Sequence, residues 1–182
     1  VDNNNISEST SFGLFFNGNN QGNTITNNSI KDAGSYAIYY NFGVPAEIDG
    51  NDLRGSSSGI YLRSAHGFNL TAPGQTGANL NQYGGHTRDV VYYSSTNDVT
   101  LENWVFKDLV PSPSGQIGFR SDNINRFTIQ NNDFTGGFTH GMRFDGTNSD
   151  NVVDNNNISE STSFGLYFNG NNQGNTITNN SI

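Results

Sequence analysis

Residues 1–30 read VDNNNISESTSFGLFFNGNNQGNTITNNSI, and residues 153–182 repeat this stretch with a single change, Tyr167 in place of Phe15. Surface positions ordinarily tolerate substitution, so folding constraints alone would not keep two such stretches alike. We interpret residues 1–152 as one long tandem unit and residues 153–182 as the start of the next copy, within a single domain that spans residues 1–182.

A shorter repeat runs inside this unit. It is a hexad with apolar residues in its first and sixth positions and, in most copies, asparagine in the fourth. The hexads occupy residues 1–6, 25–30, 48–53, 78–83, 101–106, 129–134, 153–158 and 177–182. Their starts lie 23 to 30 residues apart, which predicts six coils in the tandem unit and about seven in the whole chain.

A four-residue segment with apolar second and fourth residues follows each of the first seven hexads. The segments are residues 13–16, 37–40, 59–62, 90–93, 116–119, 141–144 and 165–168. Alternation with period two predicts a half-buried strand, and the Gly, Asn and Ser residues around it predict turns. In the fifth coil this register places Ile117 and Phe119 inside and Gly118 outside.

Short strands that recur every two dozen residues can all bury the same face if the chain winds in one direction and stacks them in parallel. Such crossovers are right-handed by default. We therefore expect an all-β fold, a right-handed parallel β-helix with uncapped ends. The two longest coils predict loop insertions at about residues 64–77 and 110–114.

The fourth hexad position is predicted to form a ladder of stacked amides along the axis. Its members are Asn4, Asn28, Asn51, Asn81, Asn132, Asn156 and Asn180. Two apolar ends require a bend within the hexad, and asparagine tolerates the sparsely populated backbone conformations that a bend demands. Stacked amides also form hydrogen bonds from coil to coil. Trp104 interrupts the ladder, where we expect a locally rearranged turn.

Composition excludes several classes of function. A net charge of −8 with only 8 basic residues does not provide a nucleic-acid-binding surface. No segment is apolar enough for membrane insertion, and the absence of cysteine rules out thiolate metal sites. We expect no cofactor. Oxygen-rich turns at residues 49–52 and 145–148 make Ca²⁺ a weaker alternative, since they lack the usual calcium-loop pattern.

The pattern N-x-I-x-x-N-x-I followed by G-I-x-aromatic resembles the parallel β-helix repeats of the pectin-lyase-like superfamily. It is most similar to the Asn-rich, carbohydrate-associated branch of that superfamily, and the resemblance covers essentially the whole chain. The resemblance implies the fold. It leaves function open, because the superfamily includes polysaccharide lyases, hydrolases, epimerases, phage tailspikes and adhesins.

The acidic residues that best fit a catalytic site are Asp122 and Asp145, with His140 on the adjacent turn. Arg120 and Arg143 lie on the same two coils, so surface ion pairs are the favoured interpretation of this cluster. We therefore expect no enzymatic activity and keep polysaccharide processing as the alternative.

A second group, His66, His86 and Asp89, borders the longer insertion. It offers metal-ligating side chains, but the spacing is not typical of a metal site, and we favour a solvated loop.

One outward residue per coil is aromatic along much of the chain. The members are Phe15, Tyr39, Tyr61, Tyr92 and Tyr167, with Gly118 and Arg143 between the last two. Stacked rings stabilise a sheet, and an exposed row of rings also provides a surface that binds sugars or a neighbouring fibre.

The near-identical ends predict that copies of the chain continue or stack in register. We therefore expect a structural segment of an extracellular or cell-surface fibre, sheath or adhesin stalk. Its partners would be further copies of itself, end to end and laterally, and carbohydrate.

Overall fold

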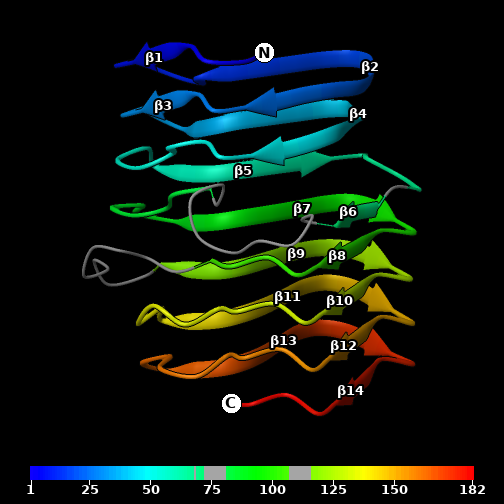
Figure 1. The fold of residues 1–182 in the computed structure, drawn as a ribbon. Coiled ribbons are helices and arrows are strands. Elements are labelled where there is room, and N and C mark those ends of the chain that lie inside the picture. The colour runs from blue at the N-terminus through cyan, green and yellow to red at the C-terminus, as the bar shows by residue number, and fades with distance from the viewer. Residues whose placement is uncertain (68, 72–80, 107–115) are drawn as a thin grey trace.

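The computed structural model describes residues 1–67, 69–71, 81–106 and 116–182, and this part of the chain contains parallel strands and no helix. Figure 1 shows the strands stacked in successive coils from the N-terminus to the C-terminus. The strands are β1 (Asn5–Ser7), β2 (Leu14–Thr26), β3 (Ser29–Lys31), β4 (Tyr36–Asp49), β5 (Ser58–Arg63), β6 (Asn69–Thr71), β7 (Asp89–Asn97), β8 (Thr100–Glu102), β9 (Ile117–Asn125), β10 (Thr128–Gln130), β11 (His140–Ser149), β12 (Val152–Asp154), β13 (Phe164–Gln173) and β14 (Thr176–Thr178).

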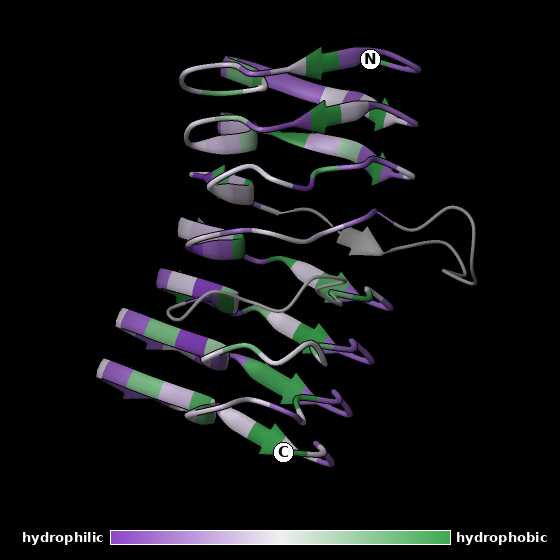
Figure 2. Cartoon of the chain, turned by 90° about the vertical axis from the view of Figure 1, so that its left-hand side faces the viewer, coloured by the Kyte–Doolittle hydropathy of each residue, from purple (hydrophilic) through white to green (hydrophobic). Residues whose placement is uncertain are grey.

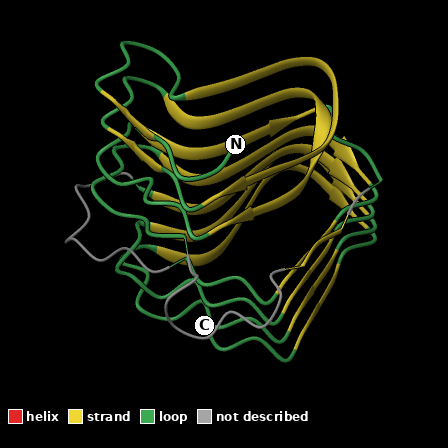
Figure 3. Ribbon diagram, turned by 45° about the horizontal axis from the view of Figure 1, so that its top comes forward, coloured by secondary structure: helices red, strands yellow, loops and turns green. Residues whose placement is uncertain are grey.

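Three parallel sheets form the wall of the β-helix. The largest has seven strands in the order β13-β11-β9-β7-β5-β4-β2, and the others have five and two strands. Seen nearer to the axis, the strands of successive coils lie over one another (Figure 3). Figure 2 shows polar residues gathered at the turns and apolar residues recurring along the strands. The predicted all-β parallel solenoid is therefore confirmed.

The apolar side chains of the seven-stranded sheet stack inside the coils as the alternation predicts. Ile38 pairs with Leu14 and Ile60, and its side chain is fully buried. Further along the same sheet Met142 pairs with Leu166. Each coil thus contributes a few apolar residues to one continuous core, which is how a chain with only 32% hydrophobic residues builds a core.

In the fifth coil the predicted register is wrong by two residues. Phe119, not Ile117, pairs with both Val91 and Met142 and is fully buried. Arg120, and not Gly118, pairs with the outward residues Tyr92 and Arg143, and Gly118 is buried.

Both registers satisfy the alternation of QIGFRS, so contacts with the neighbouring coils decide between them. In the observed register the Ser121 hydroxyl donates a hydrogen bond to Asn148 Oδ1 at 3.4 Å. It also brings Arg120 within reach of a carboxylate on the next strand. At Gly118 an added Cβ would lie 2.7 Å from the carbonyl oxygen of Gly141, so glycine is required at a position of close backbone approach.

The predicted asparagine ladder forms. The Oδ1 atom of Asn51 accepts hydrogen bonds from the backbone N–H and the side-chain amide of Asn28, at 3.0 and 2.9 Å. Asn51 in turn donates in the same two ways to Asn81, and the arrangement recurs between Asn132 and Asn156. The buried amides therefore satisfy one another from coil to coil.

The bend lies one residue earlier than predicted. The third hexad position has the left-handed backbone, with φ of 55° at Asn27, 64° at Gly50 and 57° at Asn131. The ladder asparagine is needed for its amide and not for its tolerance of positive φ.

Trp104 does not rearrange the turn as expected. Its backbone N–H donates to Asn132 Oδ1 at 2.9 Å, as a ladder residue would, and its carbonyl accepts from the N–H of Asp133. The indole is buried and stacks on Phe106 with ring centroids 5.5 Å apart. The backbone register thus survives the loss of one ladder amide.

The insertion predicted at residues 64–77 overlaps the coil wall. Residues 64–67 follow the wall, since Ser64 N–H donates to Ser94 O and Gly67 N–H donates to Asn97 O. Strand β6 pairs with β8, with Leu70 opposite Leu101, so Leu70 takes the first hexad position that was assigned to Ala78. The rest of this insertion and the one at 110–114 lie outside the described residues.

Candidate functional site

The outer surface of the seven-stranded sheet carries two parallel rows of side chains. The first, which we call the outward column, consists of Phe15, Tyr39, Tyr61, Tyr92, Arg120, Arg143 and Tyr167. The second, which we call the polar column, lies two residues further along each strand and consists of Asn17, Asn41, Arg63, Ser94, Asp122, Asp145 and Asn169.

The aromatic rings of the outward column stack on one another. Ring centroids are 5.0 Å apart between Phe15 and Tyr39, 4.7 Å between Tyr39 and Tyr61, and 4.6 Å between Tyr61 and Tyr92. Burial raises the pKa of Tyr92 to about 12, so its phenol stays neutral at physiological pH. The stacked rings therefore stabilise the sheet, as one of the two interpretations of this row expects. Part of the ring area stays on the surface, so a binding role is also compatible with the structure.

Further rings flank this column and were not part of the sequence-based set. Phe12 lies 5.1 Å from Phe15, and Tyr36 lies 4.8 Å from Tyr61 on the next coil. At the other end of the sheet Phe164 stacks on Tyr167 at 5.1 Å. An aromatic residue three positions before a column residue was the available signal.

Two guanidinium groups continue the column where rings are absent. The Cζ atom of Arg120 lies 4.9 Å from the ring centroid of Tyr92, and that of Arg143 lies 5.5 Å from the centroid of Tyr167. Their side chains are 27% and 29% exposed, so each keeps a solvent-facing part. Cation–π contact with a ring holds both cations along the same line.

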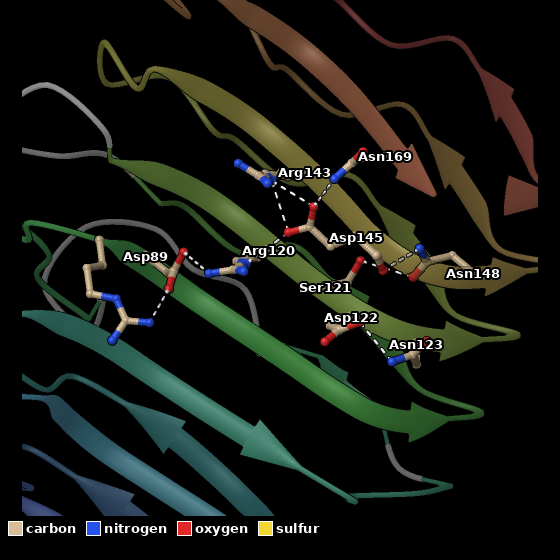
Figure 4. Close-up of polar contacts among 10 residues, drawn as sticks. Asp89, Arg120, Ser121, Asp122, Asn123, Arg143, Asp145, Asn148 and Asn169 are labelled. Carbon is tan, nitrogen blue, oxygen red and sulfur yellow. Dashed lines mark hydrogen bonds and ion pairs between the residues drawn. The ribbon is translucent and has the colours of Figure 1, made fainter. Parts of the chain in front are cut away.

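Asp145 lies between these two arginines (Figure 4). Arg120 Nε is 3.1 Å from its carboxylate, Arg143 Nε is 2.9 Å away, and the Asn169 amide donates at 3.0 Å. Burial acts to raise the pKa of Asp145, but the hydrogen bonds from Asn169 and Arg143 and the charges of both arginines outweigh it and lower the pKa. Asp145 is therefore ionised, and its carboxylate is held in place by three neighbouring side chains.

Asp89 and Asp145 lie among Arg88, Arg120 and Arg143, and we call this group the arginine cluster. The side chain of Asp89 is 1% exposed, with Arg120 Nη1 3.8 Å and Arg88 Nη2 3.9 Å from its oxygens. Burial raises its pKa despite these cations. Its Oδ2 atom forms no hydrogen bond with the described residues, so the arginines share a carboxylate that is only loosely held.

The residues of the candidate metal group use separate partners. His66 Nδ1 accepts the backbone N–H of Asn97 at 3.1 Å, whereas His86 Nδ1 lies 2.8 Å from Ser56 O. Asp89 belongs to the arginine cluster. Within the part of the chain that the structure describes, no three His, Asp or Glu side chains gather in a way that would hold a metal ion.

The three catalytic candidates share a sheet face but not a hydrogen-bond network. Asp122 and Asp145 are paired in register, yet Asp122 accepts from Asn123 and is directed towards it in Figure 4. His140 lies against Phe164 at 5.4 Å, and burial together with the charge of Arg143 lowers its pKa. Among the described residues no hydrogen bond joins any two of the three candidates.

Comparison with known proteins identifies the fold family. Residues 45–182 match the family model described as a right handed beta helix region. The chain belongs to the right-handed β-helix family. The handedness predicted from the crossover rule therefore agrees with the family assignment. No curated protein sequence matches the chain.

A solved structure with a similar fold is the A-module of the mannuronan C-5 epimerase AlgE4 from Azotobacter vinelandii. The TM-score is 0.50 and the sequence identity 14%, over 86% of this chain and 55% of that module. The β-helix chain thus spans about half the length of the module. At this identity the likeness shows a fold shared with a carbohydrate-active enzyme domain, and not an activity.

Proposed function

We propose that this β-helix is a structural segment of an extended extracellular fibre, built by continued stacking of coils. The observation that carries the proposal is the repeat itself. Residues 1–30 already stack on the coil that follows them, with Leu14 opposite Ile38 and Phe16 on Tyr40 at a centroid distance of 4.3 Å. Residues 153–182 have the same sequence apart from Tyr167, so their corresponding face fits another copy of that coil.

Burial differs sharply between the two copies. Ile25 and Ile30 are fully buried, whereas Ile177 and Ile182, which are the same residues of the repeat, are 45% and 68% exposed. Apolar area of this kind gains about 25 cal/mol for each Å² removed from water, which favours a further coil on this face. Six coils of about 4.8 Å each give the fibre an axial repeat of about 29 Å.

The chain is therefore expected to form filaments, and Ile177→Asp should abolish them, because the charge would be buried without a partner at each junction. Electron microscopy and fibre diffraction would measure filament length and the axial spacing. Thr147→Asp adds the same charge at an exposed position in β11, within the wall, and should leave elongation intact. Monodisperse single chains in small-angle scattering at high concentration would contradict the proposal.

A second function is supported by a separate observation, the pair of arginines in the outward column. Arg120 and Arg143 place two partly exposed cations beside stacked rings, which suits the carboxylates and apolar faces of an acidic polysaccharide. A binding role fits better than catalysis, because Asp145 is held ionised by both arginines and is occupied as an acceptor. We propose that the fibre binds acidic glycans along this face.

Replacing Arg120 and Arg143 together by alanine should weaken binding of oligomannuronate by about 100-fold, since each charge-assisted contact contributes about 1.5 kcal/mol or more. Calorimetric titration at two salt concentrations would measure the affinity, which should fall with salt in the unsubstituted chain. Arg126→Ala removes another exposed arginine that is paired with Asp98, and serves as the control. Equal affinity in the double variant and the control would exclude this binding face.

A further inference from the structure

A corner follows the polar column in every coil, and each corner residue has a positive φ. The residues and angles are Gly18 (92°), Phe42 (60°), Ser64 (51°), Ser95 (49°), Asn123 (57°), Gly146 (75°) and Gly170 (111°). Glycine, which has no Cβ to crowd the following carbonyl, and asparagine suit this left-handed conformation best. Phe42 alone among these corners carries an aromatic ring at a strained position.

Phe42 is also unusual in its exposure. Six large apolar side chains of the described residues are exposed, and five of them belong to residues 1–30 or 153–182, where the coil has a neighbour on one side. Phe42 is 53% exposed although coils pack on both sides of it. Neither folding nor coil stacking accounts for a strained and exposed ring, which is a combination that marks functional positions.

The Phe42 ring borders a shallow surface pocket of about 240 Å³. The pocket is lined by Asn19, Gln21, Phe42, Gly43, Val44, Ser64 and His66. The lining thus combines two amides, a hydroxyl, an imidazole and the Phe42 ring, and it contains no Asp, Glu, Lys or Arg. This differs from the arginine cluster, where cations dominate.

The imidazole adds a directed donor. Because His66 Nδ1 accepts the N–H of Asn97 at 3.1 Å, the neutral ring carries its proton on Nε2. The side chain of His66 is exposed, so this Nε2–H is available to a ligand. The pocket therefore combines donors, acceptors and a flat apolar platform.

We propose that this pocket binds one neutral sugar ring of a glycan, stacked on Phe42. The C–H face of a pyranose packs on an aromatic ring, while its hydroxyl groups are both donors and acceptors and match Asn19, Gln21 and Ser64. A charged sugar would leave its charge without a partner in this lining. The site lies at the corner of the coil, separate from the arginine cluster, so a fibre would present it once in each 152-residue unit.

The test compares Phe42→Asn with the unsubstituted chain in calorimetric titrations against cellohexaose, mannohexaose, maltohexaose and oligomannuronate. At least one neutral oligosaccharide should bind, and Phe42→Asn should weaken that binding about tenfold, because the ring's apolar contact is lost. The thermal midpoint of this variant should be equal or higher, since asparagine tolerates positive φ. Gln21→Ala should also weaken binding.

The matched control is Ser95→Asn, which places asparagine at another exposed corner with φ of 49°. It should leave the affinity for the neutral oligosaccharide unchanged. Three results would overturn the proposal: no binding of any neutral oligosaccharide at millimolar concentration, equal affinity in Phe42→Asn, or a preference for oligomannuronate that requires Phe42. Filament formation by the same variant, measured in parallel, should not change.

Discussion

Replacing Asn51 by alanine should lower the free energy of unfolding by about 4 kcal/mol, because each buried polar group left without a partner costs about 1–3 kcal/mol. Asn51 is fully buried. Its Oδ1 atom accepts two hydrogen bonds from Asn28, and its amide donates to Ile25 O at 2.8 Å, Asp49 O at 3.0 Å and Asn81 Oδ1 at 2.9 Å. Alanine removes the side-chain amide, so these groups lose a hydrogen-bond partner. Because the position is fully buried, water cannot take the place of the amide.

Urea unfolding followed by circular dichroism would measure the loss. The matched control is Asn5→Ala, an exposed asparagine of β1 outside the ladder, which should change stability by no more than about 0.5 kcal/mol. If the two variants unfolded at the same urea concentration, the ladder would not be the stabilising element inferred here.

Phe119→Ala should have an effect of similar size, a loss of about 3–5 kcal/mol, which is typical when a buried aromatic ring is removed from a core. The ring is fully buried and contacts Tyr93 at 5.7 Å and Phe144 at 5.6 Å between centroids. It also meets Phe134 edge-on at 6.3 Å. Three rings, one from the fourth coil and two from the sixth, therefore lose a neighbour at once, and the stacked backbones cannot close the cavity.

The matched control removes the same ring from the surface. Phe15→Ala truncates a side chain that is 49% exposed, so we expect a loss of about 1 kcal/mol from its contacts with neighbouring rings. Thermal and urea midpoints would give both values. A loss at Phe119 no larger than at Phe15 would show that the Phe119 ring is not part of the buried core.

The hexads and the alternating segments predicted the coil architecture because both patterns depend on local periodicity. Ile38 and Ile60 occupy the predicted inner row for this reason. The fifth coil was misplaced because alternation in QIGFRS is satisfied by two registers, and the choice depends on Asn148 and Asp145 of the next strand. No local pattern contains these contacts between coils.

The candidate site was predicted in part. Spacing placed Tyr61 and Tyr92 on one outward row, and the sequence drew attention to Asp122, Asp145 and His140 without showing which groups they would bond to. The sequence did not indicate that Asp89 pairs with the arginines. It also gave no sign that Phe42 lines a surface pocket at a corner of the coil. Their significance depends on burial and on backbone angle, which arise when coils stack.

The 152-residue repeat and its hexads determined, by themselves, that this chain is a parallel β-helix whose coils are mutually compatible, because each coil needs the same few apolar and asparagine positions. The tertiary structure alone decided which side chains meet across coils. It placed Arg120 in the outward column, surrounded Asp145 with arginines and left Phe42 strained and exposed. The physical reason is that a solenoid repeats its backbone faithfully, while the side chains on its surface are free to differ from coil to coil.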